Sequence, residues 1–191
     1  MASAWGPGCS GEASVPKSGD PKMYHQAIQQ FARTLRILDG ILGKAEAYAK
    51  TRNFDVNNFL TARLAPDMLP FTVQIRIACD TAKGAAQALS NKDLPKHEDD
   101  ETTFEQLRGR IAKCLAVIEG LSAADFAATK GETIIKMPNR PGKGMRADEY
   151  LWFRQIPNFY FHVTTAYDLL RAGGVDVGKT DYLGPLNIID L

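Results

Sequence analysis

The sequence predicts an all-α protein: a four-helix bundle with a small β-hairpin between helices three and four and an extended C-terminal tail. Four long stretches carry apolar residues at alternating steps of three and four, the spacing of one helix face. Amphipathic helices are marginal alone in water, so the four apolar faces need one another. With 191 residues, 45% hydrophobic and 24% charged, the chain matches one globular domain.

The first helix is predicted from Tyr24, after an N-terminal arm. Its apolar face is Tyr24, Ile28, Phe31, Leu35, Leu38, Leu42, Ala45 and Ala49. Residues 1–22 are dominated by Gly, Pro and Ser, with Trp5 as the only large anchor, and such a segment cannot repay its ordering entropy. We therefore expect a flexible arm over 1–22 and a bundle domain over 23–191.

The second helix is predicted to begin near Pro66 and Pro70, because proline is tolerated where its missing N–H has no helical partner. Its apolar face is Met68, Phe71, Ile75, Ala78, Ala82, Ala85 and Leu89. The connection before it, residues 52–64, contains a short helix opened by Asp55. The polar connection after it, residues 91–101, is expected to be exposed.

The third helix carries Phe104, Leu107, Ile111, Cys114, Ile118 and Leu121 on its apolar face. Thr102 with Glu105, or Thr103 with Gln106, has the spacing of a capping box at its start. After this helix, residues 133–137 indicate a strand and the letters NRPGK a turn, which together predict the hairpin.

The fourth helix carries Phe153, Ile156, Tyr160, Val163, Tyr167 and Leu170 and ends at Gly173 and Gly174. Pro157 either starts this helix or kinks it. In the tail, the residues expected to pack back on the bundle are Val175, Val177, Tyr182 and Leu183. The charged runs 98–101 and 179–181 are interpreted as solvated surface.

Composition excludes several classes of function. With 23 Lys+Arg against 22 Asp+Glu, the chain has no broad field for phosphate backbones or anionic lipid. The first residues lack the basic start and apolar stretch of a secretory signal, and no apolar run approaches the roughly 18 residues that span a bilayer, so we expect neither a signal nor a membrane span. We expect a cytoplasmic protein that binds neither nucleic acid nor membrane.

Residues 173–180 match the phosphate-binding loop pattern G-x-x-x-x-G-K-[ST], but a helix rather than a strand precedes them and the chain nearly ends after them. We interpret them as a helix end and tail. Cys9, Cys79 and Cys114 show no C-x-x-C pair or zinc spacing, so the last two are expected to be buried free thiols.

His162 is the histidine whose position favours function. His25 lies at the start of the first helix and His97 in the acidic loop, so no three histidines gather. His162 lies beside an apolar face in the body of the fourth helix, where a buried hydrogen-bonded ring is the alternative to a functional one. Asn158 lies one turn before it.

On the second helix, Asp67 and Gln74 share a face with Phe71, although Asp67 in a first turn also suits the helix dipole. The fourth helix has more aromatic residues than one buried face needs, and the excess would line a ligand cavity or a dimer surface.

Three segments carry a resemblance to a known family: ARLAPDMLPFTVQIRIACDTAKGAA (62–86), PNFYFHVTTAYDLLR (157–171) and GVDVGKTDYLGPL (174–186). They resemble an uncharacterised domain-of-unknown-function family of bacterial and fungal proteins, which is similar to the DinB/YfiT-like helical bundles. That resemblance implies a DinB-like fold. Many such bundles hold a divalent metal with three histidines, one from the second helix and two from the fourth, and include thiol-dependent transferases and isomerases.

The metal pattern is incomplete in this sequence. The second helix offers Asp67 and Gln74, and the fourth helix offers His162 with Asn158 before it and Ala166 after it. One imidazole with amides and a carboxylate is a weak set for zinc. We therefore expect no metal cofactor.

The first functional hypothesis is a small-molecule pocket between helices two and four. Asp67, Gln74 and Asn158 would bind substrate, His162 would be the acid or base, and Tyr160 would donate to an oxyanion. A proton-transfer or thiol-dependent reaction fits this equipment. The alternatives are a non-enzymatic bundle that forms a homodimer or binds a partner, and a degenerate metal-dependent hydrolase or transferase.

Overall fold

Asp20 and Pro21 start the first helix, α1 (Pro21–Thr51), in the computed structural model, which describes residues 20–137 and 140–190. The Asp20 side chain accepts the backbone N–H of Lys22, and Pro21 takes a position that needs no N–H donor. All eight residues of the predicted apolar face are buried. Pro21 and Lys22 therefore belong to the helix and not to the predicted arm, whose residues 1–19 lie outside the described part of the chain.

The second helix, α2 (Phe71–Ser90), begins later than predicted. Pro70 is its N-cap and has an extended backbone (ψ 165°). Leu69 precedes this proline and therefore avoids the α conformation, so the helix cannot extend back through it. Pro66 and Asp67 thus lie in the loop, and the prediction that Asp67 shares a helical face with Gln74 is wrong. The predicted short helix is confirmed as η1 (Val56–Phe59), opened by Asp55.

The third helix, α3 (Phe104–Glu119), uses one of the two predicted capping boxes. The hydroxyl of Thr103 accepts the backbone N–H of Gln106, and the Gln106 amide oxygen accepts the backbone N–H of Thr103. A short helix, η2 (Ala123–Phe126), follows. The predicted hairpin is confirmed: β1 (Ile134–Lys136) pairs antiparallel with β2 (Gly144–Arg146).

The fourth long helix, α5 (Ile156–Ala172), follows α4 (Ala147–Glu149) and a π-helical segment, η3 (Tyr150–Gln155). Pro157 lies in the first turn of α5 and so starts the helix. Five of the six residues of the predicted apolar face are buried or pack against the core, but Phe153 is 51% exposed, and Phe159, which is not predicted on that face, is buried. A π turn closes hydrogen bonds five residues apart instead of four, which changes the phase of residues on either side of it.

One helical turn, α6 (Lys179–Leu183), interrupts the predicted extended tail. Val175 and Val177 are buried as expected, and the ring of Tyr182 packs edge-on against that of Tyr167. Arg33 on α1 donates to the carbonyls of residues 183 and 185, which ties the start of the last segment to the bundle.

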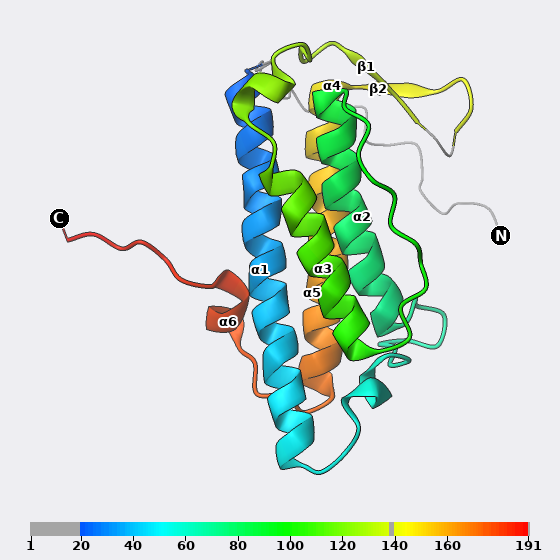
Figure 1. Ribbon diagram of the computed structural model, residues 1–191, viewed down its shortest axis with the longest axis vertical. Coiled ribbons are helices and arrows are strands. Elements are labelled where there is room, and N and C mark those ends of the chain that lie inside the picture. Colours follow the sequence, from blue (N-terminus) through cyan, green and yellow to red (C-terminus); the bar gives the residue numbers. More distant parts are fainter. Residues whose placement is uncertain (1–19, 138–139, 191) are drawn as a thin grey trace, which may run out of the picture.

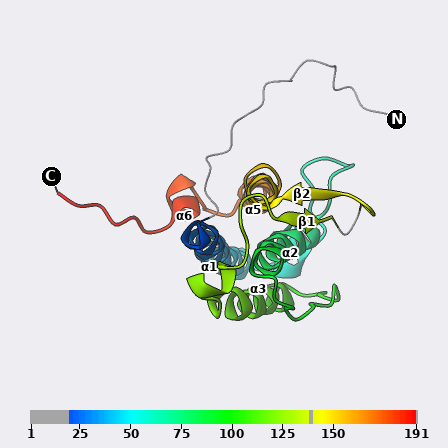
Figure 2. The same cartoon turned by 90° about the horizontal axis from the view of Figure 1, so that it is seen from above.

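The four long helices stand side by side, with the hairpin at one end (Figure 1). Seen from above, they occupy four corners in the order α1, α3, α2, α5, and α6 lies outside this ring beside α1 (Figure 2). The core fills the space between the four helices. Within the described residues, every helix is too short or too polar to cross a membrane.

Candidate functional site

His162 and Gln74 face each other across the interface between α5 and α2. The His162 ring is buried, and its Nδ1 lies 2.7 Å from the Gln74 amide oxygen Oε1. Gln74 is also buried, and its Nε2 donates to the backbone carbonyl of Leu69 at 2.8 Å. Two of the five predicted site residues therefore lie together, in a short hydrogen-bonded chain that begins at the Leu69 carbonyl.

This chain of bonds fixes where the imidazole carries its proton. Because the Gln74 nitrogen donates to a carbonyl, its oxygen is left to accept, and His162 Nδ1 must be the donor. Burial lowers the pKa of His162 below its usual value, so the ring is neutral at neutral pH. Nε2 then carries the free lone pair, and no described residue bonds to it. A neutral imidazole held in this tautomer can accept a proton at Nε2.

Two other predicted site residues lie close to His162 in sequence but face elsewhere. Asn158 donates its amide to the Thr81 hydroxyl at 2.7 Å, one turn along the same interface. The hydroxyl of Tyr160 lies 3.2 Å from Gln30 of α1, because two residues along a helix turn the side chain by about 200°. The first functional hypothesis requires Tyr160 to lie between α2 and α5. The structure instead places its hydroxyl beside α1.

Asp67 is exposed in the loop before α2, and no described residue forms an ion pair with it. Asp67 therefore lies outside α2 and does not share a helical face with Gln74. A hollow of about 490 Å³ lies on the hairpin and contains none of the predicted site residues. It is lined by Met137, Arg140, Pro141, Lys143, Gly144 and Met145.

The surroundings of His162 are apolar. The ring of Phe161 stands perpendicular to the imidazole, with their centroids 5.2 Å apart, and is 56% exposed. Leu69, whose carbonyl holds Gln74, also presents an exposed side chain.

The side chains at this site do not fit a divalent metal. The Gln74 amide oxygen already accepts from His162, and its nitrogen donates to a carbonyl. Neither Gln74 nor Asn158 supplies the nitrogen or sulfur ligands that zinc prefers. Between residues 20–137 and 140–190, no group of three His, Cys, Asp or Glu side chains could hold a metal ion. The side chains around His162 therefore do not support chemistry through a bound metal.

The remaining histidines and cysteines lie apart from His162. The His25 ring contacts the Leu121 carbonyl at 3.1 Å. Cys79 and Cys114 are buried free thiols, as predicted, and the Cys114 thiol donates to the Cys79 carbonyl. The pKa of the Cys79 thiol is raised by its contact with Cys114 and by burial, so it is not a reactive thiolate. Cys9 lies outside the described residues.

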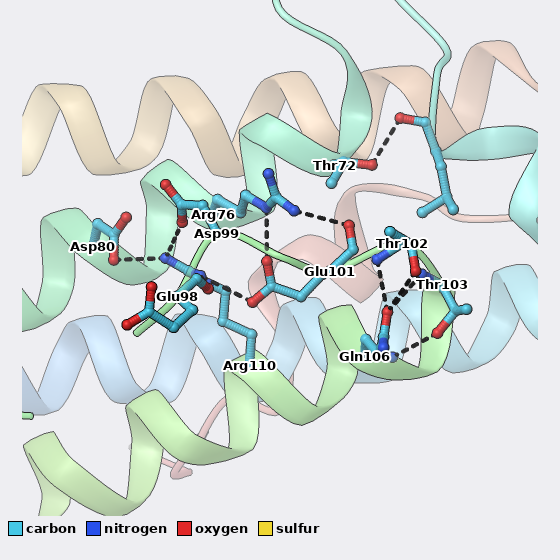
Figure 3. Close-up of polar contacts among 11 residues, drawn as sticks. Thr72, Arg76, Asp80, Glu98, Asp99, Glu101, Thr102, Thr103, Gln106 and Arg110 are labelled. Atoms are coloured by element: carbon cyan, nitrogen blue, oxygen red, sulfur yellow. Dashed lines mark hydrogen bonds and ion pairs between the residues drawn. The ribbon is translucent and has the colours of Figure 1, made fainter. Parts of the chain in front are cut away.

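A second polar cluster, which no sequence pattern predicts, joins α2, α3 and the connection between them (Figure 3). Arg110 of α3 is 1% exposed and pairs with Glu101 and Asp80. Arg76 of α2 donates to the carboxylate and to the carbonyl of the same Glu101. The prediction that Glu101 is solvated is wrong: its side chain is only 8% exposed, because two arginines enclose it.

This cluster holds the connection against the helices. Lys83 donates to the Pro95 carbonyl and Arg110 to the Glu98 carbonyl, so the backbone of this segment is tied at several points. Burial raises the pKa of Glu101, but the hydrogen bonds from Arg110 and Arg76 outweigh burial and lower it overall. Opposite charges pair across the cluster, although the buried Nε of Arg110 has no hydrogen-bond partner, and we interpret the cluster as structural. Its pairs lie 9 to 30 residues apart, and no periodic pattern marks such pairs.

The fold is that of a DinB-like helical bundle. A crystal structure of a DinB family member protein from Shewanella denitrificans, at 1.83 Å resolution, superposes with a TM-score of 0.85. It is 41% identical, over 90% of this chain and 97% of that one. The family model for the domain of unknown function DUF1993 matches residues 23–183. The chain belongs to the DUF1993 family, and the resemblance seen in the sequence is confirmed. No curated protein matches it.

Proposed function

We propose that the chain binds a small molecule at the interface of α2 and α5 and that His162 Nε2 takes a proton from it. The observation that carries this proposal is the chain from the Leu69 carbonyl through Gln74 to His162 Nδ1. Such second partners orient catalytic imidazoles and set their tautomer. An imidazole held neutral at pH 7 suits general base catalysis.

The apolar neighbours support a class of ligand. Phe161 exposes apolar ring surface next to the imidazole, so a ligand with an apolar body and one weakly acidic group fits best. The acidic group is a C–H next to a carbonyl or a thiol S–H, from which a neutral imidazole removes a proton. These correspond to the isomerisation and thiol-dependent reactions expected from the sequence.

The test is a thermal-shift screen of carbonyl compounds and thiols on wild type and His162→Ala. A compound that binds only the folded chain stabilises it by about 2.7 kcal/mol at a hundred times its Kd. We expect His162→Ala to lose this shift and His25→Ala, which removes an imidazole from α1, to keep it. A compound that shifts His162→Ala as much as wild type would contradict the site.

Proton transfer is tested separately, by NMR of the bound compound in D₂O. Wild type should exchange the acidic C–H for deuterium, and His162→Gln should not. Gln74→Leu keeps the imidazole but removes the group that orders its tautomer, so we expect exchange to slow by on the order of tenfold to a hundredfold. If the wild type binds the compound without exchanging its C–H, the proposed proton transfer by His162 is rejected and only the proposed ligand binding stands.

A further inference from the structure

A second buried glutamine holds a basic side chain beside the interface of α2 and α5. Gln155, 3% exposed at the end of η3, accepts a hydrogen bond from the guanidinium of Arg154 at 2.8 Å through its amide oxygen. Its amide nitrogen donates to the Tyr150 hydroxyl at 2.7 Å and to the Thr81 carbonyl of α2 at 3.5 Å. Because a guanidinium can only donate, these bonds fix the orientation of the amide and of the arginine, just as Gln74 fixes that of the imidazole.

The guanidinium of Arg154 has no counter-charge in the described part of the chain. Arg76, Arg108 and Arg110 each pair with a carboxylate, but no described carboxylate pairs with Arg154. Its guanidinium lies over the Tyr150 ring, 5.6 Å from the centroid, and the side chain is half-buried. A guanidinium has five N–H donors, so several of them are left for an anion from solvent.

The Tyr150 hydroxyl supplies another donor at the same place. Its oxygen accepts from Gln155, so its hydrogen points elsewhere, and no described residue accepts that hydrogen. Tyr150 is buried, and burial raises the pKa of its hydroxyl, which therefore keeps its proton at neutral pH. A buried donor without an acceptor is costly, whereas an anion between the hydroxyl and the guanidinium would satisfy both.

These two donors lie along the same interface as His162. Thr81 of α2 contacts both Gln155 and Asn158, whereas His162 contacts Gln74, seven residues before Thr81. Seven residues of an α-helix span about 10 Å, so the guanidinium and the imidazole lie about that far apart along the interface. Asn158 lies between them and is exposed, so this stretch of the interface is open to solvent.

We propose that the ligand of His162 carries a carboxylate, which binds to the Arg154 guanidinium and the Tyr150 hydroxyl. This inference rests on the function proposed for His162 and narrows the class of its ligand. The planar fork of a guanidinium matches the two oxygens of a carboxylate, and a guanidinium already held in place loses little freedom on binding. An extended chain covers roughly 1.2 Å per bond, so about eight bonds separate the carboxylate from the group that gives up its proton.

The test compares a straight-chain keto acid, whose ketone lies about eight bonds from its carboxylate, with the amide of the same chain. Isothermal titration calorimetry measures the Kd of each. We expect wild type to bind the carboxylate on the order of tenfold to a hundredfold more tightly than the amide. Arg154→Gln should bind the two equally, and Tyr150→Phe, which keeps the ring, should lose part of the preference. Arg146→Gln removes an exposed guanidinium from β2 and should keep the full preference.

Chain length tests the separation of the two groups. A keto acid whose ketone lies only two bonds from its carboxylate cannot reach Arg154 and His162 at once. We therefore expect it to bind wild type at least about tenfold more weakly than the long keto acid. Circular dichroism establishes that all variants fold. A short keto acid that binds as tightly as the long one contradicts the proposed span.

The proposal is overturned if wild type binds neither long compound, if it binds them equally, or if the preference survives in Arg154→Gln. His162→Ala separates this failure from failure of the proposed function. If both compounds bind wild type equally and His162→Ala abolishes their binding, the function proposed for His162 stands and only the carboxylate site falls. If Arg154→Gln removes the preference but His162→Ala binds the keto acid as tightly as wild type, a ligand shared by the two groups is rejected.

Discussion

Arg110 is the most deeply buried charged residue among those the structure describes, and its guanidinium is held by carboxylates from two directions. A guanidinium removed from water is costly unless its donors are satisfied, so the carboxylates matter most where they are themselves buried. Glu101 is enclosed, whereas Asp99, which also pairs with Arg110, is 63% exposed. The two acids should therefore contribute very differently.

We expect Glu101→Gln to lower the free energy of unfolding by about 3 kcal/mol, because it leaves buried guanidinium groups without their main counter-charge. Asp99→Asn is the matched control on the same arginine and should cost less than about 1 kcal/mol. Urea unfolding at neutral pH measures both. Equal losses for the two variants would show that burial does not set the strength of these pairs.

The capping box of α3 also supplies partners to hydrogen-bond donors that would otherwise be unpaired, here at the start of a helix. Two threonines are eligible from the sequence, and the structure selects Thr103, whose hydroxyl accepts the Gln106 N–H. The Thr102 hydroxyl only shares the Gln106 side chain. Only the Thr103 hydroxyl therefore satisfies a backbone donor that the helix itself leaves unpaired.

We predict that Thr103→Ala destabilises the protein by about 1 kcal/mol and that Thr102→Ala changes stability by a few tenths. Chemical denaturation of both variants against wild type is the measurement. If Thr102→Ala proved the more harmful of the two, the cap would lie one residue earlier than the structure has it.

The existence of the long helices and the faces that they bury are predictable from this sequence, except at the π turn before α5. Burial of a whole apolar face decides where a helix packs, so spacing alone places Ile28 and Ile111 correctly. The π turn before α5 has no period of its own, and it moves Phe153 from the predicted core to the surface. In the candidate site, the position of His162 is predictable from the sequence. Which of Gln74 and Asp67 lies on α2 depends on where Pro70 starts that helix, and the spacing of apolar residues does not give this.

The whole molecule carries several buried groups whose ionisation is linked to folding. Burial, with nearby Lys83, lowers the pKa of His97, and burial lowers that of His162. In the unfolded chain a histidine takes up a proton near pH 6.5, whereas folded His97 and His162 take one up only at lower pH. The stability that these two neutral rings contribute is therefore present above pH 6.5 and is lost as the pH falls below it. The lowered pKa of Glu101 adds a second loss at lower pH, as its carboxylate protonates in the folded chain.

Stability should therefore fall in two stages on acidification, first below about pH 6.5 and again below the usual glutamate range. Urea midpoints measured across this range test it. His97→Gln should reduce the first stage to the part that His162 contributes and leave the second, whereas Glu101→Gln should flatten only the second. A midpoint that stays constant between neutral pH and pH 5 would contradict the linkage.

Gln74 and His162 are separated by 88 positions of the chain and meet only through the packing of α2 on α5. Closing a loop of that length is slow and comes late in assembly, because its entropy must be lost before the contact forms. Neither helix alone, nor any fragment that ends before α5, can hold the imidazole in the required tautomer. The ligand binding that we propose at this imidazole would therefore require completed assembly, because the site forms only once the last long helix has docked.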